Sequence, residues 1–308
     1  MADQPRILVV EDEPEMLDLI SDFLTDREGC RVWRAASGRE ALDKVLSRQE
    51  IDLVLSDINM PEMKGFELLK IVEEKYPSCK RVLMTGYNVE SYLELALTYG
   101  IGNIFAKSIP FNFNELAVVV RSLLRDEIFG VLRHLSPDAN HAEFTVTGGA
   151  TLDRDAERAM ALLPEAYRSG KVELAVFEML TNAIFYGIRG EKPESKEGWD
   201  YDFELEEGAG ITVTVAWDDE KYAIAIGDNG GRLKKRDVLY WLYRQSTADE
   251  EGAPIGVFDT HGRGFFIARK YLDRVIINVA PGKRTEVILM NYVSSSHRGF
   301  KPLSINEL

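Results

Sequence analysis

Short apolar runs, each followed by a polar residue, constrain the fold of the first half of this chain more than any other feature. They span Arg6–Val10, Ile51–Ser56, Arg81–Met84 and Ile104–Ala106, and a further strand is expected around Arg31–Ala35. Near-continuous apolar runs of this length are typical of parallel strands that are covered on both faces. Helical patterns separate the runs, so five β/α units predict a doubly wound parallel sheet. Ligands of such sheets bind beyond the carboxyl ends of the strands.

The helical patterns between the runs carry recognisable start and stop signals. Leu17, Ile20 and Leu24 are spaced to lie on one face of a helix. Ser37–Glu40 has the spacing of a capping box at a helix start, and Gly100 follows a helical segment as a stop signal.

Polar side chains gather at the ends of the predicted strands. Glu11 and Asp12 follow the run that ends at Val10, and Asp57 follows the run that ends at Ser56. Thr85 and Lys107 follow the last two runs. Clustered carboxylates are costly unless a hard cation such as Mg²⁺ balances their charge. A lysine and a hydroxyl beside them would stabilise an incoming phosphoryl group. The pattern predicts phosphoryl transfer to a carboxylate, with Asp57 as acceptor; the alternative is that these acids only cap helices or face solvent.

Residues 5 to about 124 resemble the receiver domain of two-component response regulators. The resemblance rests on these five residues in their order, and on the segment Asp57–Pro61 followed by Gly65. It implies a flavodoxin-like fold, bound Mg²⁺ and a cognate sensor histidine kinase as partner. By the same resemblance the metal ligands are Glu11, Asp12 and Asp57, the phosphoacceptor is Asp57, and the switch residues are Thr85 and Lys107.

The sequence departs from the receiver pattern at two places. Lys107 is followed by Ser108-Ile109-Pro110 rather than directly by proline, and the position of the usual switch aromatic is Ile104, with Phe105 beside it. Phosphorylation is expected to be intact, whereas an output through an aromatic rotamer is not supported by these residues.

A helical stripe follows the receiver-like segment. Apolar residues recur every three or four positions from Leu116 to Leu135, which predicts a helix over 114–135 about 33 Å long, ended by Ser136–Asp138. We therefore expect domains at 1–124 and 143–308, joined by a helical connector at 125–142. The stripe is either a buried face plus linker or a dimerising signalling helix. His134 is interpreted as an ordinary exposed histidine, with a phosphoacceptor as the alternative.

The second half carries polar residues in a pattern typical of a nucleotide site. Lys171–Tyr186 is predicted to be a helix that places Glu178 and Asn182 on one face, where a carboxylate and an amide can serve a metal-bound phosphate. A predicted hairpin, Gly210–Trp217 with Tyr222–Ile226, leads to an aspartate followed by glycines. Such an aspartate can accept a hydrogen bond from an exocyclic amine.

A second glycine segment opens a helix. His261–Gly264 precedes the helical run Phe265–Tyr271, and glycines at a helix start leave free N–H groups near a phosphate. Strands at Val275–Ala280 and Thr285–Met290 are expected to close the domain.

These three segments in this order resemble the GHKL ATPase superfamily, and within it the anti-sigma-factor serine kinases, over residues 143–292. The resemblance implies a Bergerat-type α/β sandwich, with a mixed, mainly antiparallel sheet on one side and helices on the other, and ATP as a ligand. It assigns Asn182 to Mg²⁺, Glu178 to the catalytic base and Asp228 to adenine. Gly230 matches the first glycine segment of the nucleotide site, and Gly262 and Gly264 are assigned to the phosphates. The departures are an early second glycine at 231, Phe265 after the second glycine segment, a long segment at 232–260 and an insertion at 191–207.

The acidic insertion Glu191–Glu207 allows two interpretations. It holds eight acidic residues and two lysines, which is typical of a solvated loop. Trp199, Tyr201 and Phe203 lie among the acids and are the basis of the alternative, a contact patch.

Charge and cysteine content exclude several classes of protein. The chain of 308 residues has net charge −14, and an acidic surface repels nucleic acid and anionic lipid. Its two cysteines, Cys30 and Cys79, match no metal spacing or disulfide framework, and no apolar stretch reaches the length of a membrane helix. We expect a cytoplasmic protein with no nucleic acid or membrane partner, and dimerisation is possible.

The combined prediction is a response regulator that controls a serine/threonine kinase output acting on a STAS-domain anti-anti-sigma protein or a sigma factor. One alternative is a non-catalytic adaptor that uses an ATPase-like domain only for protein binding. The other is an atypical histidine kinase or phosphotransfer protein that carries phosphate on His134 or His141.

Overall fold

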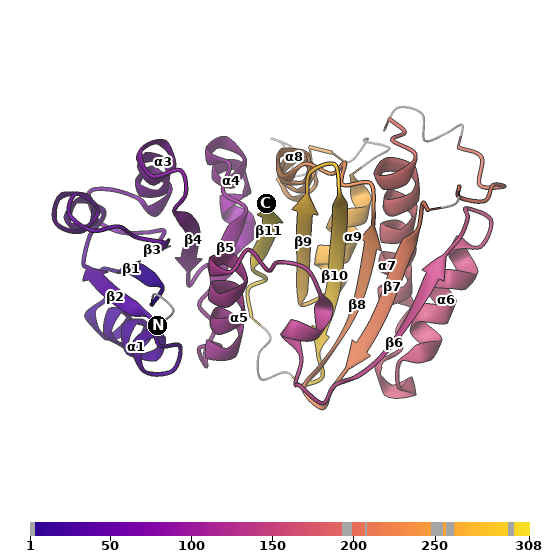
Figure 1. The fold of residues 1–308 in the computed structure, drawn as a ribbon, viewed down its shortest axis with the longest axis horizontal. Coiled ribbons are helices and arrows are strands. Elements are labelled where there is room, and N and C mark those ends of the chain that lie inside the picture. The colour runs from indigo at the N-terminus through magenta and orange to yellow at the C-terminus, as the bar shows by residue number, and fades with distance from the viewer. Residues whose placement is uncertain (1–3, 193–198, 207, 248–254, 257–261, 295–298) are drawn as a thin grey trace. The chain divides into compact units, whose positions relative to one another are not determined.

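The computed structural model describes residues 4–192, 199–206, 208–247, 255–256, 262–294 and 299–308, which form two compact units, Met1–Ile128 and Phe129–Leu308 (Figure 1). His261, much of the acidic insertion and most of the long segment before Gly262 lie outside the described residues. None of the helices in the described part of the chain is both long and apolar enough to cross a bilayer.

The first unit contains a parallel sheet with the strand order β2-β1-β3-β4-β5. Its strands are β1 (Arg6–Val10), β2 (Arg31–Ala35), β3 (Leu53–Asp57), β4 (Lys80–Thr85) and β5 (Asn103–Ala106). All five lie where the apolar runs predicted them, and the order is that of a doubly wound sheet. The flavodoxin-like prediction for this unit is confirmed.

Helices cover both faces of this sheet. They are α1 (Pro14–Asp26), α2 (Gly38–Glu40) continuing into η1 (Ala41–Leu46), α3 (Gly65–Lys75), η2 (Val89–Tyr92), α4 (Leu93–Tyr99) and α5 (Phe113–Leu124). Ile20 of α1 and Leu116 of α5 belong to one buried core with alternate residues of the strands. The predicted capping box forms in part: Ser37 Oγ accepts from the Glu40 N–H, but Glu40 Oε2 accepts from the Ala36 N–H rather than from the N–H of Ser37.

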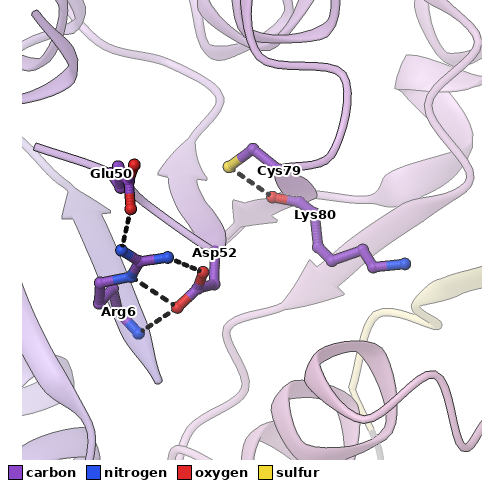
Figure 2. A network of polar contacts seen from close by, with 5 residues as sticks. All are labelled: Arg6, Glu50, Asp52, Cys79 and Lys80. Atoms are coloured by element: carbon purple, nitrogen blue, oxygen red, sulfur yellow. Dashed lines mark hydrogen bonds and ion pairs between the residues drawn. The ribbon is translucent and has the colours of Figure 1, made fainter. Parts of the chain in front are cut away.

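A charged network lies at the amino-terminal edge of the same sheet (Figure 2). Arg6 donates from Nη2 to Asp52 Oδ1 at 2.7 Å and from Nη1 to Glu50 Oε2 at 2.5 Å. The hydrogen bond from Arg6 holds the pKa of Asp52 below its ordinary value. Cys79 lies nearby, and both cysteines are buried and free. This edge is opposite to the one where the predicted acidic cluster lies.

The predicted long connector helix is wrong. Helix α5 ends at Leu124, where Asp126 adopts a positive φ of 53° and the Glu127 N–H donates to the Ser122 carbonyl. These are the bonds of a Schellman helix stop, which an aspartate can form although glycine is more usual. After Gly130 the chain forms only a short 3₁₀ helix, η3 (Val131–His134). The apolar periodicity of the sequence continues beyond the point where the helix ends, because the helix stop depends on the left-handed conformation of one residue, Asp126.

The second unit contains a mixed, mainly antiparallel sheet with the strand order β11-β9-β10-β8-β7-β6. Its strands are β6 (Asn140–Val146), β7 (Ile211–Trp217), β8 (Lys221–Asp228), β9 (Arg274–Ala280), β10 (Arg284–Tyr292) and β11 (Leu303–Glu307). Only β11 and β9 run parallel; the other neighbours are antiparallel. The predicted mixed sheet and its hairpin are confirmed.

Helices pack together on one face of this sheet. They are α6 (Leu152–Leu162), η4 (Glu165–Tyr167), α7 (Gly170–Asn182) with its π-helical extension η5 (Ala183–Ile188), α8 (Lys235–Ser246) and α9 (Arg263–Tyr271). The opposite face is partly covered by the segment Phe129–Ser136, which we call the strap. Val131 and Leu135 of the strap pack on residues of β7 to β10, among them Ala223 and Ile288. The predicted two-layer sandwich therefore has an additional covering segment.

His134 of the strap is buried, which corrects the prediction of an exposed histidine. Its side chain is 6% exposed, and Nδ1 has no hydrogen-bond partner among the described residues. Burial, together with the charges of Lys221 and Arg133, lowers the pKa of His134 to about 3. A buried ring cannot meet a phosphate donor in this conformation, so His134 gives no support to the phosphotransfer alternative. His141 is exposed in β6.

Stability of the second unit is expected to fall as the pH drops below about 6.5, the ordinary histidine pKa. Between that pH and about 3, the unfolded chain binds a proton at His134 that the folded unit does not. The free energy of unfolding should then decrease by up to about 1.4 kcal/mol per pH unit from this residue. Urea unfolding of wild type and His134→Leu between pH 7 and 5 measures the difference. His141→Leu should keep the wild-type slope; an unchanged slope in His134→Leu would contradict the assignment.

The aromatic residues of the acidic insertion pack against the end of helix α7. Trp199 stacks on Phe185 with ring centroids 4.0 Å apart and an interplanar angle of 2°, and Tyr201 and Phe203 meet the same ring edge-on. The described part of the insertion, 199–206, is therefore tied to the domain rather than being only a solvated loop. Tyr201 keeps 37% of its surface exposed, so a smaller contact patch remains.

Candidate functional site

The first candidate site lies at the carboxyl end of the parallel sheet. Glu11 and Asp12 follow β1 and Asp57 ends β3, and one carboxylate oxygen of each lies within 4.8 Å of the others. Glu11 and Asp57 are buried, whereas Asp12 is exposed. The strand order places the ends of β1 and β3 side by side, which explains why residues 46 positions apart meet.

Lys107 connects two of these carboxylates. Its Nζ donates to Glu11 Oε2 at 2.9 Å and forms an ion pair with Asp57 Oδ1. Burial alone would lower the pKa of Lys107, but the hydrogen bond and charge of Asp57, helped by Glu11, raise it above its ordinary value. Burial also raises the pKa of Glu11 to about 7. The site thus combines an ionised lysine with a carboxylate that a divalent cation would help to deprotonate.

The remaining predicted residue, Thr85, lies at the end of β4 beside the acceptor strand. It is buried, its hydroxyl accepts a hydrogen bond from the Tyr87 N–H at 3.1 Å, and its carbonyl accepts from the Lys107 N–H at 2.7 Å. The site therefore brings together all five residues that the sequence predicted for it.

Asn59 is a site residue that the sequence analysis named only as part of a loop. Its N–H donates to Asp57 Oδ2 at 2.5 Å, and its side-chain amide donates to Tyr92 Oη at 2.6 Å. The position two residues after the acceptor was the available signal, since a backbone N–H there can reach the carboxylate of Asp57.

The acidic cluster fits Mg²⁺, because its donors are three oxygen-bearing side chains close enough to share one hard cation. When bound, the cation would supply positive charge for the oxygens of a transferred phosphoryl group. Lys107 would add a second positive charge at Asp57. At the position expected for a switch aromatic, Ile104 is fully buried, and Phe105 packs in the core against Phe111.

The second candidate site is a cavity of about 610 Å³ within the second unit. It lies between the end of α7, helix α8, the start of α9 and the ends of β8 and β10. Predicted residues in its lining are Asn182, Asp228 and Gly262, and other polar and aromatic lining residues include Tyr186, Arg232, Lys234, Asp237, Trp241 and Thr285. Three segments that are distant in the sequence thus meet around one space.

Asp228 lies at the end of β8 with its carboxylate buried at the cavity. Oδ1 accepts hydrogen bonds from the N–H groups of Gly230 at 2.9 Å and Gly231 at 3.2 Å. Burial raises the pKa of Asp228, while those two backbone hydrogen bonds oppose the rise. Thr285 is its neighbour across the β8–β10 pair. The loop bonds occupy Oδ1 and leave Oδ2 as the acceptor that a cavity ligand could use.

The start of α9, which was predicted to lie near the phosphates, packs closely against α7 and α8. A methyl group added at Gly264 would lie 3.1 Å from Asn182 Nδ2 and 3.1 Å from Glu178 Oε2. At Gly262, which has a positive φ of 77° at the start of α9, an added methyl would lie 2.6 Å from the Trp241 ring. Glycine is therefore needed at Gly262, whereas at Gly264 the contacts are tight but made by the ends of side chains.

Gly230 and Gly231, the glycines that follow Asp228, pack against their own domain. A methyl group at Gly230 would collide with the carbonyl oxygen of Gly187, and one at Gly231 with the turn between β9 and β10. Arg232 then donates to the Gly187 carbonyl at 3.2 Å and to that of Ile188. The early second glycine therefore serves packing of the loop, and this explains the departure noted in the sequence.

Thr285, Trp241 and Arg232 were missed as lining residues. Thr285 belonged to a predicted strand, and the signal that could have found it is its cross-strand position opposite Asp228. Trp241 and Arg232 lie in the long segment before Gly262, where no motif marks single positions.

Comparison with known proteins concerns the first unit. Residues 7–121 match the family model described as response regulator receiver domain. Sporulation initiation phosphotransferase F of Bacillus subtilis is 30% identical over 119 residues, which cover 39% of this chain and 93% of that protein. Response regulator protein FleR of Pseudomonas aeruginosa is 33% identical over 115 residues, 37% of this chain but only 24% of FleR.

Among solved structures, chemotaxis response regulator CheY4 of Vibrio cholerae is 29% identical, covers 39% of this chain and 99% of its own, and has a TM-score of 0.36. The response regulator TrrA of Thermotoga maritima, solved with Mg²⁺ and BeF, is 36% identical with a TM-score of 0.35. The family model and the nearly complete match to the Bacillus protein coincide with the five-strand unit and its acidic site. The chain therefore belongs to the response regulator receiver family, through the receiver domain formed by residues 7–121.

Proposed function

We propose that the chain is a response regulator in which phosphorylation of Asp57 by a cognate sensor histidine kinase controls an ATP-dependent protein serine/threonine kinase of the anti-sigma-factor type. The observation that supports the output most strongly is the cavity of the second unit, which gathers Asn182, Asp228 and Gly262 from three separate segments. Its size suits a nucleotide, since small-molecule sites occupy about 300–1,000 Å³.

In this proposal each residue has a role that its surroundings support. Asp228 offers a buried acceptor oxygen for the amino group of adenine, with the Thr285 hydroxyl beside it. Asn182 would hold Mg²⁺ through its side-chain oxygen. Glu178, half-buried next to Gly264, would take the proton of an acceptor hydroxyl. Gly262 and Gly264 let the start of α9 approach the phosphates.

The proposed phosphoryl acceptor is a serine or threonine of a STAS-domain anti-anti-sigma protein, with a sigma factor as the other candidate partner. The acidic chain, with net charge −14, favours a protein partner over nucleic acid. A homodimer remains part of the proposal, since both kinds of domain can pair.

Calorimetric titration with Mg·ATP tests the proposal. The wild-type chain is expected to bind with a dissociation constant between about 1 µM and 1 mM. Glu178→Gln should keep that affinity but lower the rate of ATP turnover by about 100-fold or more, because it removes the base and leaves the cavity lining unchanged. Absence of binding by the wild type would overturn the kinase proposal.

A second candidate is an adaptor that uses the domain only to bind protein. The packing of Gly230 and Gly231 against the domain itself favours it, because neither glycine is then needed for a ligand. An adaptor predicts no heat on titration with Mg·ATP, and partner control that tolerates Asp228→Asn.

A further inference from the structure

The first residues of strand β10 face opposite sides of the sheet, and the surroundings differ on the two sides. Thr285 lines the cavity beside Asp228, whereas its neighbours Arg284 and Glu286 point to the opposite face of the sheet because side chains alternate along a strand. On that face both neighbours contact the strap. The three consecutive residues therefore join the cavity on one side to the strap on the other.

Glu286 is the centre of the contacts on the strap side. It is 3% exposed, and its two carboxylate oxygens accept from the Gly130 N–H at 3.1 and 2.9 Å. It also accepts from Asn278 Nδ2 at 3.0 Å and Arg284 Nη2 at 3.2 Å. The guanidinium of Arg284 in turn lies 4.8 Å from the centre of the Phe129 ring. Without the strap this buried carboxylate would lose the hydrogen bond from the Gly130 N–H and keep only those from Asn278 and Arg284.

The strap is held at several points, although Leu132 within it is 43% exposed. Val131 and Leu135 pack into the sheet, and the Ser136 N–H donates to Asp218 Oδ2 at 2.8 Å. Only four residues, 125–128, separate the strap from the end of receiver helix α5 at Leu124. Four residues span at most about 14 Å, so the strap is joined to α5 by a short covalent link.

We propose that the strap and residues 284–286 of β10 couple the phosphorylation state of Asp57 to ligand affinity in the cavity. A displacement of α5 would pull on Phe129 and Gly130, change the surroundings of Arg284 and Glu286, and thereby move Thr285 relative to Asp228. Because binding couplings are reciprocal, a cavity ligand would also change the affinity of the receiver for its phosphoryl mimic. The inference rests on the proposed function for its ligand, Mg·ATP.

The test measures the affinity of the full chain for Mg·ATP, at constant Mg²⁺, with and without BeF₃⁻, which mimics the phosphoryl group on the aspartate. The two wild-type dissociation constants should differ at least about fivefold. Glu286→Gln, which cannot accept all its present hydrogen bonds, should bring the ratio close to one while ATP still binds. Phe129→Ala should also reduce the ratio, and it creates no buried unpaired group if Glu286→Gln misfolds. Glu143→Gln, an exposed glutamate of β6 in the same sheet, is the matched control and should keep the wild-type ratio.

Hydrogen exchange of peptides covering 129–136 and 284–289 separates this inference from the kinase proposal. BeF₃⁻ should change exchange in both peptides of the wild type and in neither peptide of Asp57→Asn. If ATP does not bind but both peptides respond, the kinase proposal fails and the coupling route stands. If ATP binds with equal affinity in both receiver states and neither peptide responds, the coupling is overturned and the kinase proposal stands. A wild-type ratio in both Glu286→Gln and Phe129→Ala would also overturn it.

Discussion

An Asp57→Asn variant is expected to lose phosphorylation by acetyl phosphate, with the initial rate falling by more than about a thousandfold. Asparagine keeps the shape of the side chain, and its single oxygen can still accept a hydrogen bond from either Lys107 or the Asn59 N–H, which bond different oxygens of Asp57. Its amide is not a nucleophile, so the transfer has no acceptor. Intact-protein mass, combined with release of the added phosphate by hydroxylamine, detects the acyl phosphate in the wild type.

Asp52→Asn is the matched control for this experiment. Asp52 precedes the same strand but lies at the opposite edge of the sheet, paired with Arg6 (Figure 2). Its loss should leave phosphorylation unchanged and lower only the stability of the receiver. Phosphorylation that persisted in Asp57→Asn would indicate that Asp12 or Glu11 is the acceptor, and it would contradict the assignment of Asp57.

Asp228→Asn is expected to weaken Mg·ATP binding by about 100-fold or more, which corresponds to the loss of about 3 kcal/mol. The asparagine oxygen can still accept from the N–H groups of Gly230 and Gly231, so the loop keeps its anchor. The new amide group replaces the oxygen available to the cavity, and it presents a donor to the donor amino group of adenine. Calorimetry on both proteins measures the difference.

Asp237→Asn provides a control of equal charge in the same cavity. Asp237 also lines the space but is exposed on α8. Its replacement should change the affinity only slightly, because solvent screens an exposed carboxylate. Equal losses in both variants would show that cavity charge, and not the acceptor at Asp228, determines binding.

The sequence was sufficient where local pattern and strand order together determine position. Parallel strands end at one edge, so residues as distant as Glu11 and Lys107 could be expected to meet, and the 2.9 Å contact confirms it. For Asn182, Asp228 and Gly262 the expectation came from the resemblance to the GHKL superfamily, and all three line one space. In each case the residue stands at the end of an element that the hydrophobic period predicts well.

Prediction failed where tertiary contacts decide the outcome. The stop of α5 depends on a left-handed aspartate at 126, which the apolar period does not register. His134 is a polar residue near the end of the predicted helix, which favours exposure. It is nevertheless buried, because the strap crosses an apolar sheet face. Trp199 could not be placed either, since its partner Phe185 belongs to another element.

The strap also determines where the second domain can be separated from the first. A boundary at residue 143, as the sequence suggests, would remove the strap and uncover Ala216, Ala223, Ala225, Ile276, Ile288 and Met290 on one sheet face. A contiguous apolar surface of this kind promotes self-association in water. A fragment that begins before Phe129 keeps that face covered, so solubility and aggregation of excised fragments depend on these few residues.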